Sequence, residues 1–224
     1  MILIDGEQLT ISQVVAVARN DEQVRLAAHA KEHMLESYGW VQSIIAAGRP
    51  VYGINTGFGI FADQRISPAD SNRLTRNLIL SHAVATGPAL PAEVVRAAML
   101  IRANTLASGF SGVRPQVAET LLQMLNKQVT PMVPSQGSLG SSGDLAPLSH
   151  LALVFSTDES DREEDSGIAD FEGQRMSGKS AMRAAGIPRL VLGPKEGLAV
   201  NNGATFSAAI AALASGLASG LARQ

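Results

Sequence analysis

The stretch 137-GSLGSSGDLAPLSH-150 concentrates glycines and hydroxyl groups in one short segment of the sequence. Ser141 and Ser142 are adjacent, lie between two glycines and are followed directly by Asp144. Glycine adopts backbone angles that other residues avoid, so the segment is typical of a tight loop. The apolar run 145–156 that begins within it predicts a buried helix. The composition of this loop therefore calls for an explanation in terms of chemistry as well as of folding.

Three kinds of catalytic or binding site, and a plain structural turn, can be compared with the loop. A phosphate-binding loop needs a lysine after its glycines, and no lysine lies between Lys127 and Lys179. A nucleophile elbow needs Gly-x-Ser-x-Gly, which no reading frame supplies here. An amidase-type Ser–Ser–Lys site remains open only if a lysine distant in the sequence folds against the serines. A structural turn needs nothing beyond the glycines and serines themselves.

The fourth kind of chemistry is cyclisation of the backbone. If the loop holds the amide nitrogen of Gly143 against the carbonyl carbon of Ser141, a five-membered ring can close. A glycine is needed at that position because a Cβ would obstruct the approach. Loss of water and dehydration of Ser142 would leave an imidazolone that carries an exocyclic alkene. Such a ring is an electrophile, which no natural side chain supplies.

The loop resembles the signature loop of the aromatic amino acid ammonia-lyases, especially that of their histidine-specific branch. In that family an Ala-Ser-Gly triplet forms the methylidene-imidazolone cofactor autocatalytically. The resemblance implies that Ser141, Ser142 and Gly143 form the cofactor here, although Ser141 stands where the family has alanine. Only the backbone of that first residue enters the ring, so the extra hydroxyl is chemically tolerable.

Further stretches resemble the same family and keep its order along the chain, from about residue 2 to residue 210. "VYGINTGFG" implies Tyr52 as the catalytic base, with Asn55 and Gly59 as loop residues at the substrate. "NLILSHAVATG" implies that His82 lies near the substrate, and "RANTLASGFSGVRP" is also similar to the family. "EGLAVNNGAT" implies that Asn202 lies beside the cofactor, although the family's Asn-Gly-Thr reads Asn-Gly-Ala-Thr in this chain.

The fold implied by the resemblance is mainly α, of the L-aspartase/fumarase-like ammonia-lyase type. Family chains are about twice as long, so we expect an N-terminal part with a few short strands and the start of the long central helix bundle. We divide it into a cofactor-bearing domain at 1–200 and the start of the bundle at 201–224. A truncated chain, a proteolytic fragment and one half of a split enzyme are all compatible with this expectation.

The local pattern of the sequence predicts the individual elements. Thr10 and Gln13 have the spacing of a capping box at the start of a helix. Residues 50–59 are interpreted as a β-type approach into a glycine-rich loop. Small residues near Gly216 would let the last, alanine-rich helix approach its neighbours closely. His150 is expected to be structural and to bond to backbone near the loop. Helices are predicted over 21–47, 69–85, 91–107, 116–128, 145–156 and 177–187.

Composition excludes several classes of function. The 224 residues are 46% hydrophobic and 17% charged, with a net charge of −2, so a core can form and no basic cluster favours nucleic acid or anionic membranes. The lack of cysteine excludes thiol catalysis and fits a cytoplasmic location. The acidic N-terminus is unlike a signal peptide. The alanine-rich end, 204–224, is broken by glycine and serine, which indicates a packed helix and not a membrane span.

No metal or nucleotide cofactor is expected. His29 and His33 are four residues apart on a predicted helix, but no third ligand is evident. The acidic run 157–167 lacks the alternating acceptors and central glycine of an EF-hand loop, and it is predicted to be a solvated loop.

The leading prediction is an ammonia-lyase that acts on an aromatic α-amino acid, with L-histidine giving trans-urocanate as the expected reaction. An aminomutase that uses the same cofactor is the close alternative. A non-catalytic assembly domain that keeps the loop but lacks the rest of the pocket is a third. The family resemblance also implies a homotetramer whose active sites are shared between subunits, with a small amino acid as the substrate.

Overall fold

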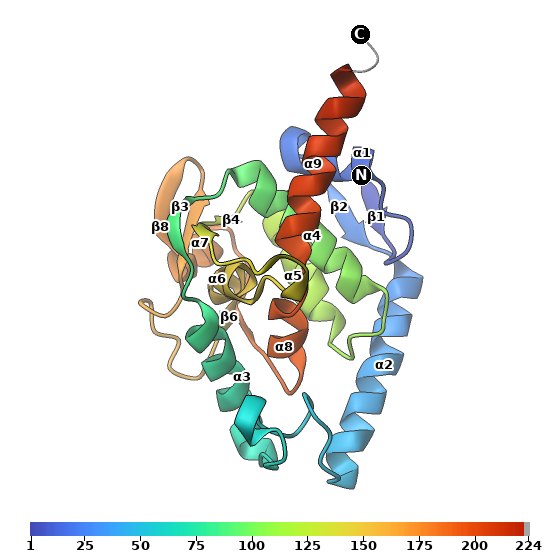
Figure 1. Ribbon diagram of the computed structural model, residues 1–224, viewed down its shortest axis with the longest axis vertical. Coiled ribbons are helices and arrows are strands. Elements are labelled where there is room, and N and C mark those ends of the chain that lie inside the picture. Colours follow the sequence, from blue (N-terminus) through green and yellow to red (C-terminus); the bar gives the residue numbers. More distant parts are fainter. Residues whose placement is uncertain (222–224) are drawn as a thin grey trace.

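The structure is a computed structural model that describes residues 1–221, so residues 222–224 of the predicted bundle segment lie outside it. It is mainly α with short strands, as predicted (Figure 1). The α-helices are α1 Ile11–Asn20, α2 Ala28–Ala47, α3 Pro68–His82, α4 Ala92–Ala107, α5 Pro115–Asn126, α6 Leu145–Phe155, α7 Gly178–Ala184, α8 Glu196–Asn201 and α9 Thr205–Leu221. The strands are β1 Ile2–Ile4, β2 Val24–Leu26, β3 Thr86–Ala89, β4 Thr130–Pro131, β5 Pro134–Gln136, β6 Ser156–Thr157, β7 Ile168–Phe171, β8 Gln174–Ser177 and β9 Leu190–Val191, and two 3₁₀ turns are η1 Gly59–Phe61 and η2 Gly140–Ser142.

Helix α4 is the centre of the molecule and is packed by α1, α2, α5 and α9 (Figure 1). Its buried residues lie all round the helix and include several alanines, which leave room for close neighbours. Two of its buried residues, Arg96 and Arg102, are charged. Buried guanidinium groups must be paired or hydrogen-bonded, so each of them connects α4 to other segments.

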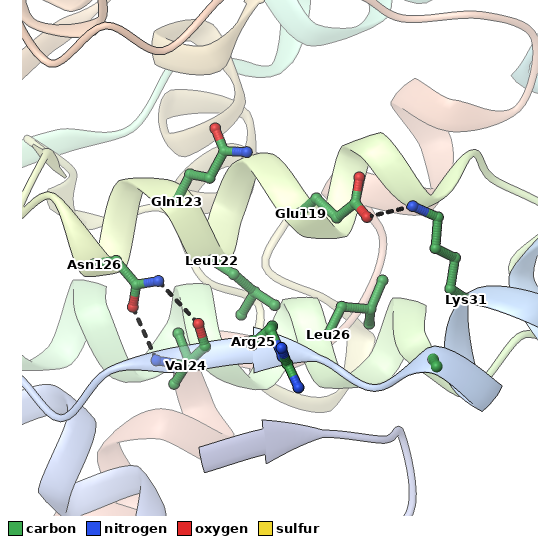
Figure 2. Close-up of a pocket in the computed structure, with 9 residues that line it drawn as sticks. Val24, Arg25, Leu26, Lys31, Glu119, Leu122, Gln123 and Asn126 are labelled. Atoms are coloured by element: carbon green, nitrogen blue, oxygen red, sulfur yellow. Dashed lines mark hydrogen bonds and ion pairs between the residues drawn. The ribbon is translucent and has the colours of Figure 1, made fainter. Parts of the chain in front are cut away.

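The N-terminal segment confirms the predicted capping box and corrects one predicted helix. The Thr10 side chain accepts from the Gln13 backbone, and the Gln13 side chain accepts from the Thr10 backbone. The prediction of one helix over 21–47 is wrong, because β2 lies within it and pairs in parallel with β1. The Asn126 side chain bonds to both backbone groups of Val24 at 2.9 Å, as Figure 2 shows. Pairing with residues distant in the sequence therefore overrides the helical pattern there.

Two other local predictions are changed by the structure. Residues 50–58 form a turn that leads into η1, and their β-type pairing is limited to an isolated bridge between Thr56 and Arg65. The acidic run 157–167 is only partly solvated, because Asp161 pairs with Arg189 and with Lys179. The backbone carbonyl of Asp165 also accepts from Arg76 at 2.6 Å. Residues of this run thus bind the buried guanidinium groups of Arg76 and Arg189.

A hairpin that the sequence pattern did not reveal follows the acidic run. Strands β7 and β8 pair antiparallel, and β4 adds to the edge of β7. The two residues between the strands, Glu172 and Gly173, both have positive φ, at 49° and 75°. A two-residue turn of this kind is typical of hairpins, so the Glu-Gly pair was the available signal.

Helix α9 packs against α4 and α1 along its length (Figure 1). A Cβ on Gly216 would come within 2.7 Å of a Val15 methyl group, which confirms that small residues allow close approach here. Within the described residues, the segment 196–218 is long and apolar enough to cross a membrane by length and composition alone. It is interrupted between α8 and α9, and the start of α9 contributes Phe206 to the core.

Candidate active site

The Ser141-Ser142-Gly143 loop is folded into a single tight turn. Residues 140–142 form the 3₁₀ turn η2, and the Gly143 amide donates to the Gly140 carbonyl at 3.1 Å. Gly143 has a φ of 125°, which L side chains rarely adopt, and a Cβ there would lie 2.9 Å from a Leu145 methyl group. Both serines are exposed while Gly143 is buried. The φ of Gly143 is therefore what requires a glycine at the last position of the turn, since the Leu145 methyl group can move aside.

Asp144 fixes this turn to the start of α9. Its backbone amide donates to the Gly203 carbonyl at 2.8 Å. Its carboxylate accepts from the amides of Phe206, at 2.6 Å, and Ser207, at 3.3 Å, and also from the Ser138 hydroxyl. A carboxylate at these amides satisfies donors in the first turn of a helix and matches the positive end of the helix dipole. The fully buried side chain of Asp144 thus joins the loop to α9.

Asn202 lies beside the loop, as the resemblance implies. A Cβ on Gly143 would lie 3.9 Å from the Asn202 side-chain oxygen and 4.0 Å from the Gly203 carbonyl oxygen. Asn202 follows α8 directly and is exposed. The short helix α8 therefore sets where this amide group lies relative to Ser141 and Ser142.

An ion pair anchors the start of α8. Arg114 donates to both carboxylate oxygens of Glu196, at 2.8 and 2.6 Å, and the Glu196 side chain is fully buried. The backbone amides of Arg114 and Gly193 also donate to that carboxylate. The hydrogen bond from the Arg114 guanidinium is the main cause that raises the pKa of Arg114. The pair ties the approach to α5 to the segment that carries Asn202.

Replacing Glu196 with glutamine is expected to lower the free energy of unfolding by about 3 kcal/mol, because it leaves the Arg114 charge uncompensated. Urea unfolding measures this change. The matched control is Glu164→Gln, whose exposed pair with Arg162 spans 3.8 Å. Such a surface pair contributes less than about 1 kcal/mol. Equal losses in the two variants would contradict the anchoring role.

The end of α3 reaches the loop through a pair of strands. His82 is the last residue of α3, and its Nδ1 lies 2.9 Å from the Leu78 carbonyl oxygen. Strand β3 follows it and pairs with β5, which leads directly into Gly137. A Cβ on Gly137 would lie 2.7 Å from the Ala85 methyl group. The His82 segment and the Ser141-Ser142-Gly143 loop are therefore neighbours.

His150 is structural in this structure, in agreement with the prediction. Its Nε2 accepts from the Ala85 backbone amide at 3.1 Å, which requires that nitrogen to be unprotonated. Burial lowers the pKa of His150 below its ordinary value of 6.5. Neutral His150 thus holds the link between α3 and β3 against helix α6.

Acid is expected to weaken this link before it affects the carboxylates. Because the pKa of His150 is lower in the folded state, the unfolded state takes up its proton first as the pH falls below 6.5. The stabilisation by neutral His150 is complete above pH 6.5. It is lost as the pH falls from 6.5 to the lower pKa of the folded state. We expect the melting temperature to fall between pH 7 and pH 5, and to fall less in His150→Gln, which accepts the same bond without titrating. The same pH slope in both proteins would contradict this assignment.

Tyr52 lies on an exposed turn that it shares with Asn55. Its side chain is 61% exposed and stacks edge-on against Phe58, with ring centres 6.2 Å apart. The turn touches α8, because a Cβ on Gly53 would lie 3.0 Å from a Leu198 methyl group. No hydrogen bond joins Tyr52 to the Ser141 turn within the described residues. Helix α8 thus contacts the Tyr52 turn, and Asn202, which directly follows α8, lies beside the loop.

The structure gives Asn55 and Gly59 different roles. The Asn55 side chain is buried, accepts from the Val51 amide at 2.7 Å and donates to the Arg49 carbonyl at 2.9 Å. Asn55 therefore shapes the turn that carries Tyr52. Gly59 has a φ of 58°, opens η1 and has free space around the position of a Cβ. Gly59 is exposed, in line with a loop that faces a ligand.

A pocket away from these residues lies between β2, α5 and the start of α2 (Figure 2). The Lys31–Glu119 ion pair crosses it at 2.9 Å. None of the predicted site residues lines it. Among the described residues, no group of three or more His, Cys, Asp or Glu side chains could hold a metal ion. His29 and His33 are therefore not part of such a group.

The sequence pattern missed the buried charges that hold the site together. Arg102, Glu196 and Asp144 were not singled out for a role, although all three lie within stretches that resemble the family. Their partners are distant in the sequence: Arg114 and Glu196 are 82 positions apart, and Asp144 and Phe206 are 62 positions apart. The available signal was a set of charged residues inside otherwise apolar or glycine-rich segments.

The chain is similar to known proteins over nearly its whole length. A family model described as aromatic amino acid lyase matches residues 9–224. The histidine ammonia-lyase of Caldanaerobacter subterraneus subsp. tengcongensis is 50% identical over 212 residues, which are 95% of this chain and 40% of that protein. This chain therefore spans about 40% of the length of the curated relatives it matches.

Solved structures show the same relationship. An ergothioneine-degrading ergothionase from Treponema denticola matches with a TM-score of 0.88 at 30% identity, covering 95% of this chain and 41% of that one. A tyrosine aminomutase from Streptomyces globisporus matches with a TM-score of 0.85 at 34% identity, covering 96% of this chain and 39% of that one.

Proposed function

The chain belongs to the aromatic amino acid lyase family, and from that premise we propose that it functions as an ammonia-lyase that converts L-histidine to trans-urocanate. One observation carries the proposal. The turn that contains Ser141 and Ser142 ends on a buried glycine with a φ of 125°, close to the side-chain oxygen of Asn202. The serine loop and the Asn202 segment, which are far apart in the sequence, thus lie side by side at Gly143.

The loop fits the formation of a methylidene-imidazolone from its own backbone. The Gly143 nitrogen would bond to the Ser141 carbonyl carbon, whose oxygen leaves as water with the amide hydrogens of Ser142 and Gly143. The Ser142 hydroxyl and its Cα hydrogen would leave as the second water, which creates the alkene. Because Gly143 has no side chain, nothing on it obstructs the approach of its nitrogen to Ser141 in the first step. Ser142 is exposed, so the second water can leave to the solvent. The ring supplies an electrophile for the substrate amine.

The other residues take the roles that the resemblance implies. Tyr52 removes the β-proton of the substrate, and its phenol must be activated by nearby positive charge or hydrogen-bond donors. His82 orients the imidazole of the substrate or assists proton transfer. Asn202 donates to the oxygen of the ring or of the substrate. Gly59 offers its backbone amide as a further donor, and Asn55 holds the turn on which Tyr52 lies.

An aminomutase remains the close alternative, supported by the similarity to the tyrosine aminomutase. It would use the same loop and return the amine to the β-carbon. A non-catalytic assembly domain is the third candidate, since Tyr52 lies on an exposed turn without hydrogen bonds to the loop among the described residues.

The assembly around the site is part of the same proposal. We expect a cytoplasmic homotetramer of the L-aspartase/fumarase-like type, with active sites shared between subunits and without a metal or nucleotide. The division into a cofactor-bearing domain at 1–200 and the start of a central bundle at 201–224 stays a prediction. The native mass in solution tests the tetramer directly.

Intact mass and product analysis test the function together. The protein is expected to weigh two water molecules less than its sequence and to absorb in the near ultraviolet. Incubation with L-histidine, followed by NMR, is expected to show trans-urocanate and ammonia. A β-amino acid product would favour the aminomutase, and a ring without turnover would favour the assembly domain. A mass that equals the unmodified sequence in an active protein would refute the cofactor.

A further inference from the structure

Arg102 contacts the segment around Gly203, which lies beside the cofactor loop. It comes from the middle of α4 and is 4% exposed. Its Nη2 donates to the Thr205 hydroxyl at 2.5 Å and its Nη1 to the Ala199 carbonyl at 3.3 Å. These two partners flank the Asn202–Gly203 dipeptide on either side. The guanidinium thus spans the break between α8 and α9.

Gly203 rests directly on this guanidinium. A Cβ at Gly203 would lie 2.3 Å from Nη2 of Arg102, so no other residue fits while the arginine keeps its place. Gly203 has a φ of 151°, at the edge of the range that L side chains rarely adopt. Its carbonyl accepts from the Asp144 amide at 2.8 Å. A continuous series of contacts therefore runs from Arg102 through Gly203 and Asp144 to Gly143.

The charge of Arg102 suits this place. Burial lowers its pKa to about 10, and the nearby Asp144 carboxylate partly offsets that effect, so the guanidinium remains charged at neutral pH. Its Nε has no hydrogen-bond partner within the described residues although it is buried. Buried donors are normally paired, so an unpaired one calls for a reason. Contact with Gly203 and the two bonds beside it account for the orientation.

We propose that Arg102 is a positioning residue that sets the rate at which Ser141, Ser142 and Gly143 close into a ring. The proposal rests on the function proposed above. Ring closure needs the Gly143 nitrogen held against the Ser141 carbonyl carbon, and holding reacting atoms in place accounts for a large part of such rates. Arg102 fixes the Gly203 carbonyl, which fixes the Asp144 amide next to Gly143. A looser support would let the turn leave the reactive geometry.

The test is the rate of water loss in Arg102→Lys compared with Arg96→Lys. Arg96 is also buried in α4, and it donates to the carbonyls of Val17, Ala18 and Leu125, away from the loop. Each protein is made by cell-free synthesis and sampled over time by intact-mass spectrometry. Its melting temperature is measured in parallel. We expect ring formation at least about tenfold slower in Arg102→Lys and within about twofold of wild type in Arg96→Lys.

Thr205→Val serves if Arg102→Lys fails to fold. It keeps the shape of the side chain and removes only the acceptor of Nη2. Slower ring formation in this variant, at an unchanged melting temperature, would support the proposal. Wild-type rates in the variants at Arg102 and Thr205 would overturn it, and so would an equal slowing in Arg96→Lys. A wild-type protein that loses no water overturns the proposed function instead, so the two failures are distinguishable.

Discussion

Replacing Ser142 with alanine is expected to abolish the near-ultraviolet absorbance of the ring and all measurable turnover. The Ser142 hydroxyl is the leaving group that creates the exocyclic alkene, and an alanine Cβ carries no leaving group. The variant can lose at most one water, by closure between Ser141 and Gly143. Intact mass, absorbance and urocanate formation measure the three consequences in the same sample.

Ser141→Ala is the matched control for this variant. Neither Ser141 nor Ser142 makes a side-chain hydrogen bond within the described residues, and both are exposed, so neither change is expected to affect stability. Only the backbone of Ser141 enters the ring, and alanine is what the family carries there. We expect this control to keep the ring and the activity. Activity that survives in Ser142→Ala, or two lost waters in that variant, would refute the proposed chemistry.

Tyr52→Phe is expected to lower turnover by a factor of about 10²–10⁴, which is the usual contribution of a general base. The ring should form normally, because Tyr52 makes no hydrogen bond to the loop within the described residues. Its aromatic packing against Phe58 is kept by phenylalanine. The measurement is kcat for L-histidine, together with the near-ultraviolet absorbance as a readout of the ring.

The second tyrosine of the chain provides the control. Tyr38 lies on α2, and Tyr38→Phe makes the same chemical change at a residue without a predicted catalytic role. It is expected to leave both kcat and absorbance unchanged. Turnover in Tyr52→Phe within about twofold of wild type would show that another group removes the proton. A lost absorbance band would instead assign Tyr52 to ring formation.

Several features of the fold could be predicted because their causes are local. The Thr10–Gln13 capping box acts across one helical turn, and helix α6 follows from a mostly apolar run. The tight loop before α6 follows from its glycines. The helix predicted over 21–47 shows the limit of such reasoning. Its first residues, Val24–Leu26, form a strand only because β1 and Asn126 supply partners from elsewhere in the chain.

In the candidate site, too, some features could be predicted from the sequence and others depend on residues distant in the chain. The resemblance placed Asn202, His82 and the serine loop in one site, and the structure brings their segments together through β3, β5 and Gly203. The acidic run was predicted to be solvated because charge alone favours water. Its pairing with Arg189 depends on a cation that another part of the chain buries.

The sequence by itself determined which backbone the proposed ring would use. Glycine at 143 and adjacent serines are properties of single residues and their immediate neighbours, and no packing can create them. Only the tertiary structure decided what holds that backbone still. The contacts of Arg102 with Thr205, of Arg114 with Glu196 and of Asp144 with Phe206 join residues that lie 62 to 103 positions apart. Buried charges must find partners in three dimensions, and sequence spacing carries no record of such distances.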